Sequence, residues 1–120
     1  NINMWHGPIC LNDAKNTYFT VGKYDGTHQV MSIYGPISGT GNIIGNTSDT
    51  TLEARLNLFN PNNTFTGGIS MLKRLELWLH ANGAVPANGA DITLTDTSLV
   101  LAGKGHETYR MEDSDSSFGG

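Results

Sequence analysis

GPIC at Gly7–Cys10, GPIS at Gly35–Ser38 and GGIS at Gly67–Ser70 are three copies of one short motif, in which Gly is followed by Pro or Gly, then Ile, then a small residue. The copies begin 28 and 32 residues apart. A repeat of about 20 to 50 residues is typical of solenoids and similar arrays, in which each unit packs on the next. The spacing therefore predicts that the three isoleucines lie in neighbouring parallel strands.

Short segments of alternating hydrophobicity fill the rest of each repeat. The longest is Leu75–Leu79, where the leucines lie on one face and Glu76, Trp78 and the following His80 lie on the other. Shorter alternating triplets occur at 9–11, 19–21, 56–58, 69–71, 92–94 and 99–101. Gly, Asn, Thr and Ser account for 48 of the 120 residues, a composition that favours strands and turns over helices.

These patterns predict an all-β chain folded as a right-handed parallel β-helix, or β-solenoid, of three to four rungs. A rung of three short strands cannot bury its apolar side alone, but stacked rungs share one continuous core. Asn and Thr at equivalent turns could share hydrogen bonds between rungs. An antiparallel β-sandwich or jelly roll is the alternative, because a chain of this length also fits those folds. We expect the solenoid to span residues 1–111 and residues 112–120 to form an acidic, polar C-terminal tail.

Four segments follow one another in a recognisable order: Ser38–Gly41 (SGTG), Leu56–Leu58 (LNL), Asn62–Gly68 (NNTFTGG) and Leu75–Leu77 (LEL). With them, the sequence from 37 to 103 resembles the autotransporter-associated β-strand repeat. The resemblance implies a β-helix with a non-enzymatic structural or adhesive role in an extracellular surface protein or fibre, bacterial or phage. It implies no catalytic residues. A carbohydrate-binding or carbohydrate-cleaving β-helix, such as a phage tailspike fragment, is the alternative function.

The acidic residues form no sequence motif. Asp49, Glu53, Asp91 and Asp96 are candidates for carbohydrate cleavage by residue type alone, since a β-helix enzyme builds its site from carboxylates on adjacent rungs. Asp49 and Asp96 stand beside Thr or Ser in segments typical of turns, and we expect turn formation rather than catalysis to be the role of these acids. The sequence therefore predicts no enzyme activity and no catalytic residue.

The remaining metal-binding residue types are equally scattered. The four histidines, His6, His28, His80 and His106, lack the close spacing of a sequence-local metal pair. The single cysteine, Cys10, excludes a disulfide framework within the chain and lies in a segment typical of a strand. We expect neither a metal site nor a cofactor.

Trp78 is the one residue that the pattern suggests for surface binding. If the leucines of 75–79 face the core, Trp78 faces outward, where its ring could stack on a sugar or join a protein contact. Coverage by the connector 81–89 is the alternative. The net charge of −4 and the lack of a basic cluster predict no nucleic-acid partner. The longest apolar run is far shorter than the roughly 20 residues of a membrane span.

The two ends of a solenoid expose unpaired strand edges, which proteins usually cover. No segment at either end has the pattern of an amphipathic capping helix. We therefore expect that the isolated chain is not a stable lone monomer. The predicted partners are neighbouring rungs of a longer parent chain or identical subunits, and surface glycans are a further candidate.

Overall fold

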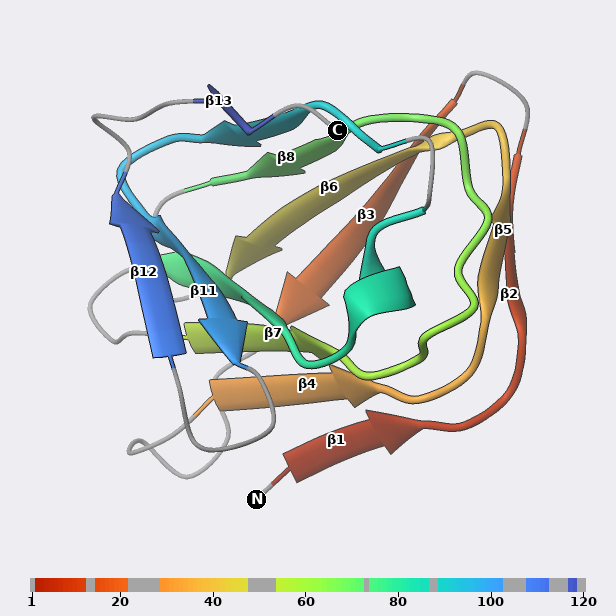
Figure 1. Ribbon diagram of the computed structural model, residues 1–120, viewed down its shortest axis with the longest axis horizontal. Coiled ribbons are helices and arrows are strands. Elements are labelled where there is room, and N and C mark those ends of the chain that lie inside the picture. Colours follow the sequence, from red (N-terminus) through yellow and green to blue (C-terminus); the bar gives the residue numbers. More distant parts are fainter. Residues whose placement is uncertain are drawn as a thin grey trace.

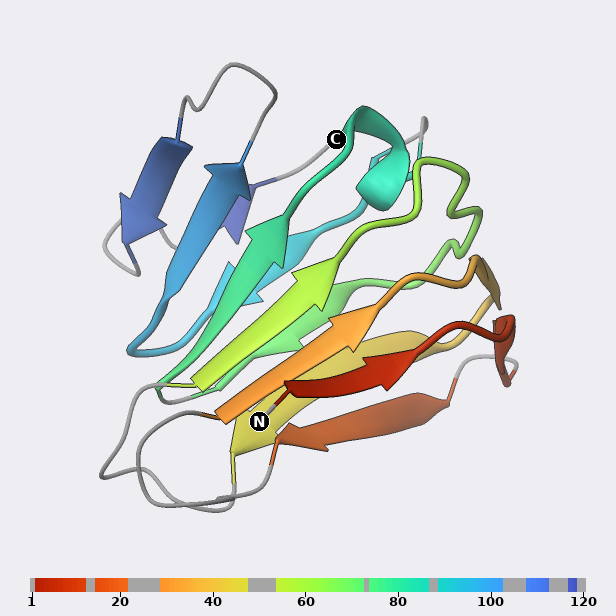
Figure 2. The ribbon, with the colours of Figure 1, turned by 90° about the horizontal axis from the view of Figure 1, so that it is seen from below.

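The chain winds through successive rungs, and strands from neighbouring rungs lie side by side (Figures 1 and 2). The computed structural model describes residues 2–12, 15–21, 29–47, 54–72, 74–86, 89–102, 108–112 and 117–118. The elements are β1 (Ile2–Trp5), β2 (Ile9–Leu11), β3 (Asn16–Val21), β4 (Gln29–Ile33), β5 (Ile37–Gly39), β6 (Asn42–Thr47), β7 (Ala54–Leu58), β8 (Ile69–Met71), β9 (Leu75–Leu79), the 3-10 turn η1 (Asn82–Ala84), β10 (Ile92–Leu94), β11 (Ser98–Ala102), β12 (Thr108–Glu112) and β13 (Ser117–Phe118).

The strands form three sheets, which we call sides A, B and C of the solenoid. Side A has the order β1-β4-β7-β9-β11-β12, side B consists of β2 and β5, and side C has the order β13-β10-β8-β6-β3. Every described pair that joins successive rungs is parallel, and only β12 and β13 pair in the antiparallel sense. The predicted parallel β-helix is confirmed, and the sandwich alternative is excluded.

The rungs differ in length. We number them by residues: rung 1 is 2–21, rung 2 is 29–47, rung 3 is 54–72 and rung 4 is 74–94. On side A, Ile2 of rung 1 pairs with Val30, whereas Ala54 of rung 3 pairs with Leu75. Rung 3 therefore uses fewer residues than rung 1 to complete one turn of the solenoid. The corners between strands absorb this difference.

The core lies inside the solenoid, because alternate residues of each strand point inward. Leu75, Leu77 and Leu79 are buried while the residues between them are half-buried, as the alternation predicted. Leu77 pairs with Leu56 and Leu99, and all three are fully buried. Burying a leucine side chain stabilises a fold by about 1.5–3 kcal/mol, so these leucine rows contribute much of the stability.

Polar side chains connect neighbouring rungs along side C. The Asn42 side-chain amide donates to Oδ1 of Asn16 at 3.1 Å, and Oδ1 of Asn42 accepts from the backbone N–H of Gly68 at 2.9 Å. The Thr20 hydroxyl donates to Oδ1 of Asn46 at 2.6 Å. Asn and Thr therefore share hydrogen bonds between rungs, but these pairs lie in strands β3 and β6 rather than at the turns where we expected them.

One expected pairing is wrong. Ile9 pairs with Ile37 in parallel strands, as predicted, but Ile69 lies on side C and pairs with Ile43 and Ile92. The reason is that side B has no strand in the described part of rung 3. There, the backbone N–H groups of 64 and 66 donate to carbonyl groups of 37 and 39, and the chain reaches its next strand only on side C.

The described C-terminal strands fold back onto the solenoid. Strand β12 pairs with β11, and Ser117 and Phe118 of β13 pair with Thr93 and Ile92 of β10. We expected residues 112–120 to form a solvated acidic tail, but part of this segment adds a strand to side C. The two antiparallel strands therefore cover the exposed edges of β10 and β11 at this end.

Candidate functional site

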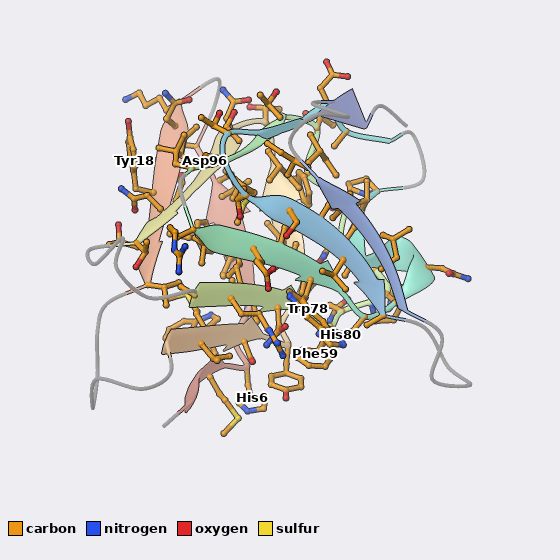
Figure 3. The ribbon with its side chains drawn as sticks, turned by 90° about the vertical axis from the view of Figure 1, so that its left-hand side faces the viewer. His6, Tyr18, Phe59, Trp78, His80 and Asp96 are labelled. Carbon is orange, nitrogen blue, oxygen red and sulfur yellow. The ribbon has the colours of Figure 1, made fainter. Side chains whose placement is uncertain are left out.

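Four stacked rings run along the outside of the solenoid beside side A (Figure 3). We call His6, Tyr34, Phe59 and His80 the aromatic column. Each residue directly follows the side A strand of its own rung, so parallel stacking of the rungs places the rings one above another. Successive ring centroids lie 4.8, 4.5 and 4.0 Å apart, and the ring planes are nearly parallel. Such ring pairs contribute about 0.5–1.5 kcal/mol each beyond their buried area.

The stacking decides which parts of these rings can meet a ligand. The facing surfaces of neighbouring rings are covered by each other, so the column presents mainly ring edges to solvent. Tyr34 is exposed, and Phe59 is half-buried. The column therefore offers an amphipathic contact surface, and it leaves no gap between its members for a sugar ring.

Trp78 faces outward from β9, as the alternation predicted, and it is half-buried (Figure 3). The Arg55 guanidinium lies 3.7 Å from the indole centroid, so a cation covers one ring face. Nε1 of Trp78 donates to Oε1 of Glu76 at 3.1 Å, and the Ser98 hydroxyl donates to Oε2 of the same carboxylate at 2.9 Å. The indole is held in place from several directions, and that face is unavailable for stacking on a sugar.

A chain of polar contacts lies beneath these rings. Nε2 of His80 lies 2.9 Å from Oδ1 of Asn57, whose side-chain amide donates to the Ser32 hydroxyl at 3.1 Å. Asn57 and Ser32 are buried on the outer face of side A. Burial lowers the pKa of His80 below its ordinary value of 6.5, and the positive charge of Arg55 lowers it further.

The lowered pKa of His80 predicts that acid weakens the fold through this residue. The folded chain holds the His80 proton less tightly than the unfolded chain. As the pH falls below 6.5, the unfolded state therefore takes up the proton first, and the free energy of unfolding decreases. We expect the urea midpoint to be lower at pH 5 than at pH 7.5, as measured by far-UV circular dichroism.

The His80→Phe variant provides the comparison for this pH effect. It keeps a ring against Phe59 but cannot titrate, so its midpoint should change less between the two pH values than that of the unmodified chain. All other titratable groups are common to both proteins and cancel in the difference. An identical pH dependence in the two proteins would show that protonation of His80 does not affect the free energy of unfolding.

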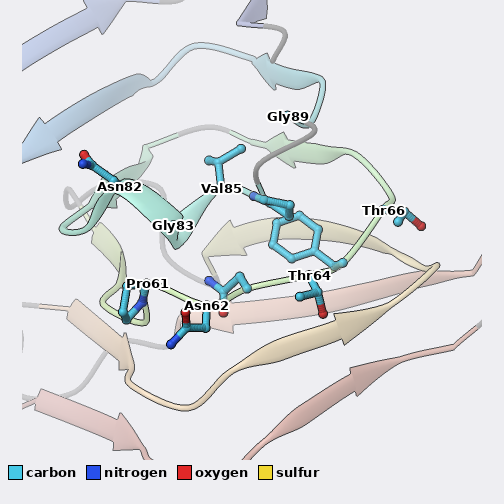
Figure 4. A pocket seen from close by; sticks show the side chains of 11 residues that line it. Pro61, Asn62, Thr64, Thr66, Asn82, Gly83, Val85 and Gly89 are labelled. Carbon is cyan, nitrogen blue, oxygen red and sulfur yellow. The ribbon is translucent and has the colours of Figure 1, made fainter.

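A groove of about 780 Å³ lies on the side where the described residues of rungs 3 and 4 form no side B strand (Figure 4). The lining residues are uncharged, and they combine amide and hydroxyl groups with apolar atoms. They are Pro61, Asn62, Asn63, Thr64, Phe65, Thr66, Asn82, Gly83, Val85, Pro86 and Gly89. Such a groove suits a neutral ligand rich in hydrogen-bonding groups better than it suits an ion.

The acids considered for catalysis are not brought together where the structure describes them. Asp91 directly precedes β10 and Asp96 lies two residues after its end, so the two acids follow one another along the chain and are not stacked at one position of adjacent rungs. Asp96 has φ of 56° and lies in a turn, the role expected for it. Asp49 and Glu53 lie outside the described residues.

The other predicted residues are placed as follows. His6 and His80 are the two ends of the aromatic column, while His28 and His106 lie outside the described residues. Cys10 is a free, exposed thiol in β2. Within the described ranges, no three His, Cys, Asp or Glu side chains gather to hold a metal ion. No helix in the same ranges has the length and hydrophobicity needed to cross a bilayer.

The sequence did not reveal the aromatic column or the groove, although it carried a partial signal for the column. An aromatic residue or His precedes the Gly-Pro pair in two rungs, at His6 and Tyr34. Comparison with family models, with characterised proteins and with solved structures gave no match to this chain.

Proposed function

We propose that this chain is a structural or adhesive module of an extracellular surface protein or fibre, without catalytic activity. The parallel stacking of rungs is the observation that carries the proposal. A parallel β-helix lengthens by adding rungs, each of which contacts only its neighbours, and this produces a rod. The resemblance of residues 37–103 to the autotransporter-associated repeat supports the same role and a cell-surface location.

The outer surface of the solenoid is consistent with a contact role. Its aromatic column and Trp78 are fixed by stacking, by Arg55 and by hydrogen bonds, so they form a preorganised surface. Preorganised side chains lose little conformational entropy when they meet a partner. Neighbouring rungs of a longer chain, identical subunits and surface glycans are the partners that we propose.

Carbohydrate binding is the second candidate function, and the uncharged groove favours it. Asn62 and Asn82 are exposed on the two walls of the groove, and their amides can donate to and accept from sugar hydroxyl groups. Thr64 and Thr66 add exposed hydroxyl groups on the same segment. A neutral oligosaccharide is the ligand class that this lining fits.

One experiment separates these functions from enzymatic cleavage. The chain is incubated with a panel of immobilised and soluble polysaccharides, and both retention and new reducing ends are measured. We expect no release of reducing ends. If a polysaccharide retains the chain, the Asn62→Ala/Asn82→Ala variant should be retained at least tenfold more weakly, while Thr93→Ala, at an exposed position outside the groove, should behave like the unmodified chain.

Each other outcome has a defined meaning. Chain-dependent release of reducing ends would overturn the non-enzymatic proposal. Retention that the groove variant leaves unchanged would exclude the groove as the sugar site. A chain that is neither retained nor active would be consistent with a purely structural module.

A further inference from the structure

The two ends of the solenoid differ in how their strand edges are covered. At the C-terminal end, β12 and β13 pair with the last parallel strands of sides A and C. At the N-terminal end, β1, β2 and β3 are the outermost strands of their sheets, and no described strand pairs with their outer edges (Figure 2). We call the edges of β1, β2 and β3 the N-terminal edge.

Backbone hydrogen-bonding groups point outward from this edge. The carbonyl of Trp5 faces rung 2, where it accepts from the N–H of Tyr34 at 2.8 Å. Successive residues of a strand direct their backbone groups to opposite sides, so the N–H and C=O of Met4 face away from rung 2. The same alternation applies to β3. There, the carbonyl of Lys15 accepts from the backbone N–H of Asn42, so the backbone groups of Tyr18 point away from rung 2.

The N-terminal edge lacks the features that usually prevent edge-to-edge pairing. Exposed edge strands typically carry charged residues or proline. The sequences of β1 (INMW), β2 (ICL) and β3 (NTYFTV) contain neither. The strand at the other end of side A, β12, contains Arg110 and Glu112. An additional strand is therefore far better tolerated at the N-terminal edge.

The hydrophobic core also reaches the surface at this edge. Trp5 aligns with Ile33 and Leu58, and both of those side chains are at most 1% exposed. Trp5 itself is 55% exposed. Met4 aligns with the outward-facing Ser32, and it adds a 58% exposed apolar side chain on the outer face of the same strand. An apolar end combined with unpaired strand backbone is what a further β layer would cover.

We propose that the N-terminal edge pairs with the same edge of a second copy of this chain, related by a twofold axis. A twofold rotation reverses strand direction, so the edges meet as antiparallel strands, the more stable pairing. Head-to-tail stacking fits poorly, because it sets β1 against the charged β12 and the long β3 against the two-residue β13. Lys15 is the sole charged side chain among the described residues of rung 1, so little charge repulsion opposes this contact.

This proposal goes beyond the proposed function and predicts a closed dimer, because a twofold contact uses up both edges. The test is sedimentation velocity of the chain between about 1 and 100 µM. We expect a monomer–dimer equilibrium with no larger species. In the Met4→Lys/Tyr18→Lys variant, charged side chains border the edge, and the dimer should be lost. Thr93→Lys adds one charge at an exposed strand position of rung 4 and should leave the dimer intact.

A second measurement keeps the test decisive if the double variant folds poorly. In the unmodified chain, hydrogen exchange at the Met4 and Tyr18 amides should slow as the concentration rises. A strictly monomeric chain at 100 µM would overturn the proposal and leave this edge to another occupant, such as preceding rungs of a longer chain. Growth beyond a dimer, or exchange that does not depend on concentration, would also overturn it.

Discussion

The Gly35→Ala variant is expected to lose about 4 kcal/mol or more of its free energy of unfolding, an unusually large effect for a single methyl group. A Cβ atom at position 35 would overlap the carbonyl oxygen of Gly7 in the preceding rung and would lie 2.8 Å from the carbonyl oxygen of His6. These atoms belong to the backbone, so no side chain can rotate away. The rungs would have to separate at this corner, and urea denaturation at about 2 µM measures the cost.

Gly7→Ala is the matched control, because Gly7 occupies the same corner one rung earlier. A Cβ atom there would meet the Trp5 ring at 3.5 Å, an ordinary contact distance. The control should therefore change stability by no more than about 0.5 kcal/mol. If both variants lost similar stability, the cost would come from the flexibility of the Gly-Pro corner rather than from contact between rungs.

The inward and outward alternation of the strands could be predicted from the sequence, because it depends only on neighbouring residues. Leu75–Leu79 alternates in the structure as its sequence indicates, and the first two motifs stack as their spacing predicted. The third motif was assigned to the wrong side, because rung 3 crosses side B without a strand. A fixed repeat length cannot reveal such a change, since Ile69 keeps its inward direction on either side.

The same irregularity of rung 3 kept the aromatic column from being predicted. The aromatic residue that precedes the third motif is Phe65, which is buried in the core, and it is Phe59 that stacks on Tyr34 in the column. The signal was present in another form, since Phe59 also directly follows the end of an alternating strand. The coverage of Trp78 by Arg55 could not be predicted, because it depends on the register between two strands far apart in the sequence.

The groove was beyond prediction for a related reason. Its walls are the strandless part of rung 3 and the connector that contains η1, and neither has a regular hydrophobic pattern. The path of such segments is set by individual contacts. One of these, between Asn63 and two backbone groups, links three rungs.

Asn63→Ala is expected to lower the free energy of unfolding by about 2–4 kcal/mol. Oδ1 of Asn63 accepts from the backbone N–H of Ile37 at 2.9 Å, and Nδ2 donates to the carbonyl of Ala84 at 2.9 Å. Asn63 is 5% exposed, and Ile37 and Ala84 are fully buried. Alanine would leave both backbone groups without these partners, at about 1–3 kcal/mol for each unpaired group. Urea denaturation measures the loss.

Asn62→Ala tests whether the effect belongs to the position rather than to loss of an asparagine from this segment. Asn62 is exposed, and the contact recorded for it uses its backbone N–H, which alanine retains. Its replacement should cost no more than about 0.5 kcal/mol. Where side B lacks strands, the Asn63 amide adds two side-chain bonds between rungs to the backbone bonds that Thr64 and Thr66 make. Equal, small losses in the two variants would show that the rungs hold together at this corner without it.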